Sequence, residues 1–190
     1  MDERTSTNLK DLNVVITGAA RSLGAALALG LSDLGCNVIL CARSREALDV
    51  IAGQMEARTG RRPEKFVIDL ADAASVEATA QAISARVPVV DILINNGTAW
   101  LGSRETPYEA AEVMAVINSA ITGTFLFTQA LIPALHRSAR PDVVTIGSIS
   151  GLLNVSTYTA SVPFYAAKRG QAEPTPGGGQ TARCQRSGLA

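Results

Sequence analysis

Short apolar runs alternate along this chain with longer segments in which apolar residues recur every three or four positions. The apolar runs are continuous, as is typical of strands covered on both faces of a parallel sheet. The predicted strands are 13–17, 37–41, 65–70, 90–96 and 142–150. The helical periodicity predicts helices at 22–34, 44–60, 72–87 and 108–135. Strands and helices that alternate with short connections predict an α/β fold with a three-layer, doubly wound parallel sheet.

The ends of the predicted helices carry residues that favour helix starts and stops. Ser44 and Asp72 precede their helices and are good N-caps, because their side-chain oxygens accept a backbone N–H of the first turn. Gly35 and Gly60 follow two of the helices and are typical of helix stops. These residues set the expected boundaries of the first three helices.

The alternating pattern ends near residue 172. The stretch EPTPGGGQTARCQRSGLA has few large apolar side chains, so it buries too little surface to offset the entropy of ordering. We therefore expect a domain over 1–172 and a disordered tail over 173–190. The sheet would be incomplete on its C-terminal side, with the fifth strand as an exposed edge.

Composition narrows the class of protein without changing this fold. The chain has 190 residues, 47% of them hydrophobic, and its 17 basic and 17 acidic residues cancel. This balance argues against nucleic acid or a membrane surface as a partner. No apolar run is expected to reach the length of a membrane span, and the polar N-terminus is not a secretory signal. We expect a cytoplasmic protein.

The cysteines and the single histidine suggest no metal site. Cys36, Cys41 and Cys184 lack the spacing of metal ligands. Cys36 and Cys41 flank an apolar strand, where reduced and buried thiols are expected. His136 follows the long predicted helix and is expected at the surface.

The first strand leads into TGAARSLG, which predicts a tight turn before the first helix. Such a turn presents free backbone N–H groups at the positive end of a helix, where a phosphate binds well. Gly18 would let the chain turn, and Gly24 would let the helix approach its neighbours without a Cβ atom. The two glycines alone are equally compatible with an ordinary tight turn.

Four segments together resemble the short-chain dehydrogenase/reductase family over residues 13–172. TGAARSLG resembles the family's Thr-Gly-x-x-x-Gly-x-Gly turn, and VIDLADAASV resembles its adenine-side segment. DILINNG resembles its Asn-Asn-Ala-Gly motif. GSISG and FYAAK resemble its catalytic serine and its Tyr-x-x-x-Lys motif. The resemblance implies a Rossmann-type fold and nicotinamide chemistry.

The resemblance also implies which residues bind the dinucleotide. Ser22 stands where the family has its middle glycine; its hydroxyl would donate to a phosphate or cap the first helix, and both roles remain open. Tyr165 and Lys168 would hold the nicotinamide ribose. The remaining implied cofactor residues are Gly18, Arg21, Ser22, Leu23, Gly24, Arg43, Ser44, Asp69, Leu70, Asn95 and Gly97.

Two arginines favour NADP(H) over NAD(H) as the cofactor. An acidic residue at the end of the second strand would bind a ribose 2′-hydroxyl, but NVILCARSRE has no carboxylate before Arg43. Arg43 and Ser44 are expected beside the 2′-substituent, with Arg21 as a second cation. Arginine suits a phosphate through its charge and its forked donors. The alternative is that Arg43 and Arg45 belong to a solvated helix start.

The resemblance implies Ser148, Tyr165 and Lys168 as catalytic residues. Lys168 is three residues after Tyr165, whereas the family motif has four, and Arg169 occupies the fourth position. On a helix, a spacing of three falls about 60° short of a full turn and a spacing of four overshoots by about 40°. Alignment of TGTF with the family puts Ala120, and not Asn118, at the position of a relay asparagine.

The implied function is an NADP(H)-dependent oxidoreductase that interconverts a small carbonyl compound and its alcohol, with tyrosine as proton donor and acceptor. One alternative is a protein that binds the dinucleotide without catalysis. A further alternative is a truncated family member whose tail is read out of frame. The long helix 108–135 is the expected surface for a homo-oligomer, and the substrate stays open.

Overall fold

The computed structural model describes residues 9–152, 159–172 and 182–183. Within them one sheet has the strand order β3-β2-β1-β4-β5-β6. The first five strands are parallel and β6 is antiparallel to β5, so the predicted α/β class and parallel sheet are confirmed. The strands are β1 (Asn13–Thr17), β2 (Asn37–Ala42), β3 (Glu64–Val67), β4 (Ile92–Asn95), β5 (Asp142–Thr145) and β6 (Ala182–Arg183).

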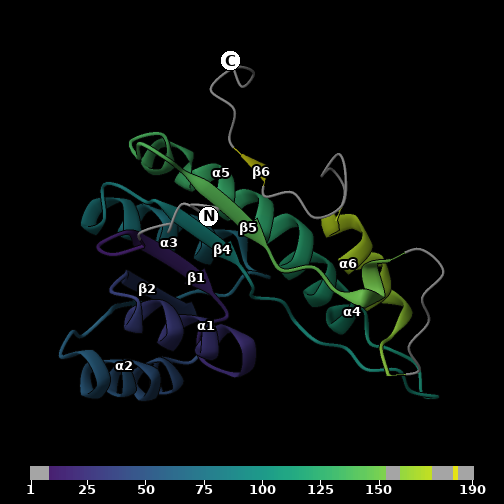
Figure 1. Cartoon of the computed structure of the whole chain (residues 1–190). Helices are drawn as coiled ribbons and strands as arrows, with labels where there is room; N and C mark the ends of the chain where they lie inside the picture. Colours follow the sequence, from purple (N-terminus) through teal and green to yellow (C-terminus); the bar gives the residue numbers. More distant parts are fainter. Residues whose placement is uncertain (1–8, 153–158, 173–181, 184–190) are drawn as a thin grey trace, which may run out of the picture.

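Helices cover both faces of the sheet and make the three layers of the fold. Figure 1 shows α1 and α2 on one side and α3 and α5 on the other. The last helix, α6, packs against α4 and the turns next to it. The helices are α1 (Ser22–Asp33), α2 (Arg45–Thr59), α3 (Ala73–Arg86), α4 (Ala110–Ile117), α5 (Gly123–Leu135) and α6 (Val162–Ala172).

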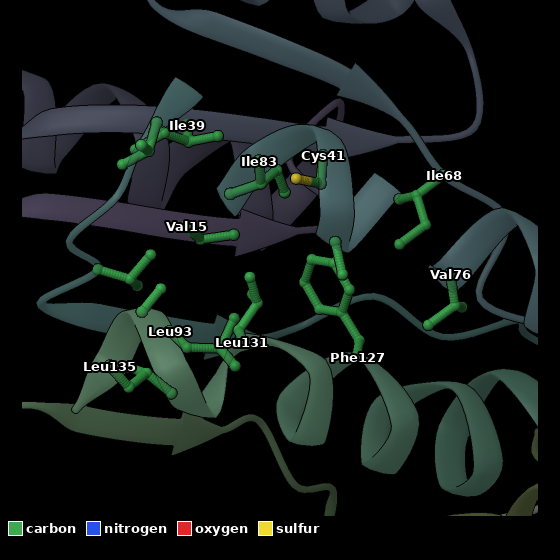
Figure 2. Packing of buried hydrophobic residues seen from close by; sticks show 14 of the residues in the cluster. Val15, Ile39, Cys41, Ile68, Val76, Ile83, Leu93, Phe127, Leu131 and Leu135 are labelled. Carbon is green, nitrogen blue, oxygen red and sulfur yellow. The ribbon is translucent and has the colours of Figure 1, made fainter. Parts of the chain in front are cut away.

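The core consists of two apolar clusters separated by the sheet. Successive side chains of a strand point to opposite faces, so Val15 and its neighbour Ile16 enter different clusters. In the cluster of Figure 2, strand residues meet Ile83 of α3 and Phe127 and Leu131 of α5. The other cluster joins the sheet to α1 and α2. Burial on both faces explains why the strands read as continuous apolar runs.

The expected helix ends are confirmed at α2 and α3. Ser44 Oγ accepts the backbone N–H of Ala47 at 3.1 Å, and Asp72 Oδ1 accepts that of Ala74 at 3.0 Å. Gly60 follows α2 with φ +71°, a backbone conformation that glycine adopts without strain.

Several boundaries differ from the sequence-based prediction. The third and fourth strands, expected over 65–70 and 90–96, are the shorter β3 and β4. The fifth, expected over 142–150, ends at Thr145 and is followed by a 3-10 turn, Ile149–Gly151. Apolar residues continue past the strand ends because the connecting segments are also buried; Ile68 is 2% exposed and Leu70 8%.

The long helix expected over 108–135 begins at Ala110 and contains a π-helical turn, Asn118–Thr122, between α4 and α5. Within the described chain, Ala110–Leu135 is long and apolar enough to cross a membrane, with 26 residues and a mean hydropathy of 1.5. The expectation that no apolar run reaches this length was therefore wrong. A core helix passes the same test, and Phe127 and Leu131 are fully buried against α3, so this is weak evidence for a membrane span.

The edge of the sheet beyond β5 is partly covered. The backbone of Ala182 and Arg183 pairs with Val143 and Asp142, so two residues of the predicted tail belong to the sheet. The rest of 173–190, including Cys184, lies outside the described residues. Cys36 and Cys41 are buried free thiols and His136 is exposed, as expected.

Candidate functional site

A cavity of about 470 Å³ opens at the carboxyl ends of β1, β2 and β4. The strand order changes direction between β1 and β4, and ligands of open α/β sheets bind at such switch points. The cavity wall comes from four connecting segments and α4 with the π turn. It consists of Gly18, Ala20, Arg21, Ser22, Leu23, Gly24, Ala42, Arg43, Ser44, Ala47, Ile68, Asp69, Leu70, Ala71, Asn96, Gly97, Thr98, Ala99, Ala115 and Ser119.

Three glycines let the β1–α1 turn and the segment after β4 approach each other. Gly18 has φ +67°, and a Cβ atom on it would lie 2.8 Å from Gly97 Cα. A Cβ atom on Gly24 would lie only 2.1 Å from the Gly18 carbonyl oxygen. A Cβ atom on Gly97 would lie 2.9 Å from Leu70 Cδ1. Side chains at these positions would force the cavity wall apart.

Two side chains fasten the same segments together. The Thr17 hydroxyl, which is buried, accepts the backbone N–H groups of Asn96 at 3.0 Å and Gly97 at 2.9 Å. The Asn96 side-chain amide donates back to the carbonyl oxygens of Thr17 and Gly18. These bonds satisfy backbone groups of the glycine turn and of the segment after β4 and hold the two segments together.

The first turn of α1 faces the cavity without a side-chain cap. Its N-cap is Arg21, which makes no side-chain capping bond, so the proposed capping role of Ser22 was wrong. Ser22 has φ +47°, a left-handed conformation that is rare for a residue with a side chain. This conformation explains why the family has a glycine where this chain has Ser22, because glycine adopts a positive φ without strain. The uncapped N–H groups are suited to an anion.

A Ser22→Gly variant is expected to unfold at a higher urea concentration than the wild type. Relief of the left-handed strain is worth about 1 to 2 kcal/mol, and the greater freedom of glycine in the unfolded chain takes back about half of this. Ser22→Ala, which removes the hydroxyl and keeps the strain, serves as the control. A glycine variant less stable than the alanine variant would contradict the assignment.

The two arginines in the cavity wall differ from the five arginines that form salt bridges among the described residues. Arg21 and Arg43 are exposed, and neither forms a salt bridge with any other described residue. The paired arginines are Arg58 with Asp33, Arg61 with Asp11, Arg62 with Glu56, Arg86 with Glu64 and Arg104 with Glu112. The cavity therefore carries two cations whose charge is available to a ligand.

The predicted adenine-side residues also lie in the wall. Asp69 Oδ1 accepts the backbone N–H of Ala71 at 2.9 Å, and the Asp69 backbone N–H donates to Ser75 Oγ at 2.9 Å. These bonds fix the turn between β3 and α3, which places Asp69 and Leu70 against the cavity.

Of the two neighbouring asparagines, the structure puts Asn96 and not Asn95 in the cavity wall. Asn95 is 3% exposed, and its side-chain amide donates to Thr128 Oγ1 at 2.9 Å. Its Oδ1 atom is the one buried side-chain polar atom without a partner among the described residues. Both faces of this strand are covered and the run DILIN has no alternation, so the sequence alone did not show which asparagine faces the cavity.

The far end of the cavity was missed by sequence reasoning. Thr98, Ala99, Ala115 and Ser119 line it. Ser119 Oγ accepts the backbone N–H of Ala99 at 2.9 Å and donates to the Val116 carbonyl oxygen at 3.3 Å. The π turn places Ser119 there, and no motif in the sequence indicated it. Ala120, the expected relay position, is fully buried in the apolar cluster beside α6.

The three predicted catalytic residues lie beyond β5 and are not part of the cavity wall. Ser148 Oγ accepts the backbone N–H of Ser150 at 3.1 Å. The Lys168 ammonium donates to the Ile146 carbonyl oxygen at 2.9 Å and to Gln171 Oε1 at 2.7 Å. Burial lowers the pKa of Lys168 to about 8. The backbone N–H of Ile146 binds the Asn95 carbonyl oxygen, so α6 is tied to the end of β4 through this loop.

The inward face of α6 combines Lys168 with phenylalanine one turn earlier. Phe164 and Lys168 are 5% and 4% exposed, and they are four residues apart. The Phe164 ring contacts Trp100 edge to face, with 4.6 Å between centroids. Tyr165 is half-buried at the side of the same apolar cluster. Phe164 lies four residues and Tyr165 three residues before the lysine, so both neighbour it on the helix, but Phe164 is the one buried with it.

Two solved structures of other proteins have a similar fold and contain a bound dinucleotide. The Pseudomonas aeruginosa RhlG/NADP active-site complex superposes with a TM-score of 0.77 at 28% identity, over 86% of this chain and 64% of that protein. A putative short chain dehydrogenase from Escherichia coli CFT073, complexed with NADPH, gives a TM-score of 0.78 at 26% identity, over 86% and 68%.

The curated relatives are longer than this chain. Dehydrogenase/reductase SDR family member 7B from Xenopus tropicalis is 32% identical over 167 residues, which cover 83% of this chain and 54% of the relative. A rhamnolipids biosynthesis 3-oxoacyl-acyl-carrier-protein reductase from Pseudomonas aeruginosa is 33% identical over 143 residues, 73% of this chain and 55% of that enzyme. The chain thus spans about half the length of these relatives.

The family model of short chain dehydrogenases matches residues 12–171, from the strand before the glycine turn to the helix that carries Lys168. This match covers the whole sheet of parallel strands and the cavity. The chain therefore belongs to the short-chain dehydrogenase family of oxidoreductases.

Proposed function

We propose that this chain binds NADP(H) in the cavity at the ends of β1, β2 and β4. The observation that carries the proposal is the pair Arg21 and Arg43, two cavity-lining guanidinium groups without a salt bridge to another described residue. The uncapped start of α1 supplies N–H groups for the pyrophosphate. Arg43 at the end of β2 supplies a forked cation for the 2′-phosphate.

We further propose carbonyl–alcohol interconversion as the reaction. The nicotinamide would supply or accept the hydride. The Ser148 hydroxyl would donate a hydrogen bond to the substrate oxygen, and the Tyr165 hydroxyl would pass the proton to or from it. The Lys168 ammonium, the cation of α6, would lower the pKa of the tyrosine. Residues after the glycine turn and beyond β5 would thus hold cofactor and substrate at one edge of the sheet.

The second candidate function is dinucleotide binding without turnover. It is favoured by the engagement of the Lys168 ammonium with Ile146 and Gln171, which holds it away from the cavity wall. It is also favoured by Phe164, which lacks a hydroxyl and occupies the position one turn before that lysine. In this case the cavity would serve a sensor or a partner subunit.

Fluorescence titration with NADPH and NADH tests the binding proposal, and we expect tighter binding of NADPH. A folded protein without affinity for either dinucleotide, or with tighter NADH binding, would contradict it.

Oxidation of NADPH in the presence of a panel of small carbonyl compounds then separates the two functions. If the chain is a reductase, Tyr165→Phe should lower kcat by about 100-fold or more, with a much smaller effect on NADPH binding. Tyr108→Phe is a matched control, because Tyr108 Oη bonds Gly102 outside the cavity. NADPH binding by the wild type without turnover of any carbonyl would support the second function.

A further inference from the structure

The hydroxyl of Ser44 lies in the cavity wall, but its single proton is already engaged. Ser44 Oγ donates to Glu46 Oε2 at 2.9 Å and accepts the backbone N–H of Ala47 at 3.1 Å. A serine hydroxyl has one proton to donate. A phosphate, which only accepts hydrogen bonds at its charged oxygens, would find this donor occupied by a carboxylate.

Glu46 also adds negative charge three residues after Arg43 in the chain, on the side chain that holds the Ser44 proton. It is exposed on the first turn of α2 and forms no salt bridge with a described residue. Hydrogen bonds from its own backbone N–H and from Ser44 lower the pKa of its carboxyl, so the group is ionised at neutral pH. The end of the cavity that we assign to the 2′-substituent is therefore lined by a cation, Arg43, and by a serine whose proton is held by an anion, Glu46, next to the lining.

Resting on the proposed binding of NADP(H), we infer that Glu46 weakens the affinity for the 2′-phosphate and so limits the preference for NADPH over NADH. It does so by holding the Ser44 proton and by repelling the phosphate. A ribose 2′-hydroxyl carries no charge and can itself donate to a carboxylate, so Glu46 does not oppose NADH. The balance between Arg43 and Glu46 then sets the selectivity of the site.

Replacement of Glu46 by glutamine isolates the repulsion, because a glutamine carbonyl oxygen can still accept from Ser44 while the charge is removed. Repulsion between a unit charge and a phosphate dianion about 6 Å apart in water would change affinity about tenfold without salt; screening reduces this, and we expect about fivefold tighter NADPH binding. NADH binding should change by less than about twofold. The gain should shrink in about 0.5 M NaCl, which screens exposed charges.

Glu77→Gln is the matched control, since Glu77 lies on α3, bonds only Gln81 in the same way and does not line the cavity. Adenosine 2′,5′-bisphosphate serves as a probe that carries the 2′-phosphate without the nicotinamide. Thermal unfolding followed by circular dichroism verifies that each variant folds.

The outcomes separate the inference from the function on which it rests. Fivefold tighter binding of NADPH and of the bisphosphate by Glu46→Gln alone supports the inference. Equal NADPH affinity of Glu46→Gln and the wild type, or an equal gain for NADH, overturns it with the proposed function intact. Absence of binding of every dinucleotide to the folded wild type overturns both.

Discussion

A Gly24→Ala variant is expected to lose about 3 kcal/mol of unfolding free energy and its affinity for NADPH. The added Cβ atom would lie 2.1 Å from the Gly18 carbonyl oxygen and 2.6 Å from Asn96 Nδ2. Neither neighbour can yield cheaply: Gly18 is backbone in a tight turn, and Asn96 is held by its bonds to Thr17 and Gly18. The start of α1 must move away from the β4 segment, which separates the two walls of the cavity.

Urea unfolding and NADPH titration measure the two effects in the same preparation. Gly30→Ala is the control, because Gly30 lies in the same helix and no atom would lie within 4 Å of its new Cβ. Alanine favours a helix interior over glycine by about 0.5 to 1 kcal/mol, so this control should be more stable than the wild type. Wild-type stability and binding in Gly24→Ala would show that the turn is looser than described.

The contact between Gly24 and Gly18 belongs to the part of the site that could be predicted from the sequence. The strand, the tight turn and the helix were predictable because each rests on local physics: an apolar run, a glycine with positive φ and a periodic apolar face. Gly24 was expected to allow close approach, and the approach is to Gly18 itself. The parallel sheet was predictable from the repeated strand–helix–strand pattern, whereas the strand order was not predicted and comes from the structure.

Features that depend on contacts between distant parts of the chain were harder to predict from the sequence. The choice between Asn95 and Asn96 depends on which strand residue faces the cavity, and a motif without an alternation pattern does not settle it. The π turn that brings Ser119 to the cavity has no local signature among the small residues NSAIT. The lengths of β3 and β4 were overestimated because buried apolar residues continue beyond the residues that pair in the sheet.

The sequence showed that the spacing of lysine and tyrosine departs from the family motif, but it did not show which cation takes the place of the motif's lysine. Spacing alone left Lys168 and Arg169 as alternatives, and the structure buries Lys168 and leaves Arg169 exposed. The inward direction of Lys168 follows from packing, because Phe164 and Ala167 fill the apolar cluster on the same face of α6. On this buried face of α6, the aromatic residue beside Lys168 is Phe164.

The double variant Arg21→Glu with Arg43→Glu is expected to change the ratio of NADPH to NADH dissociation constants by about 100-fold in favour of NADH. Hydrogen bonds to charged groups contribute about 1.5 to 3 kcal/mol each, and the new carboxylates would repel the 2′-phosphate. Neither arginine forms a salt bridge with a described residue, so their replacement breaks no ion pair there. Stability should therefore stay close to that of the wild type.

Fluorescence titration with both dinucleotides, at low and high salt, provides the measurement. Arg137→Glu is the matched control: it reverses an exposed charge next to Pro88, before the start of β4 and away from the carboxyl ends of the strands where the cavity opens. Its effect on the ratio should stay below about threefold, because a distant exposed charge is screened by water and salt. An unchanged ratio in the folded double variant would contradict the placement of the 2′-phosphate between these arginines.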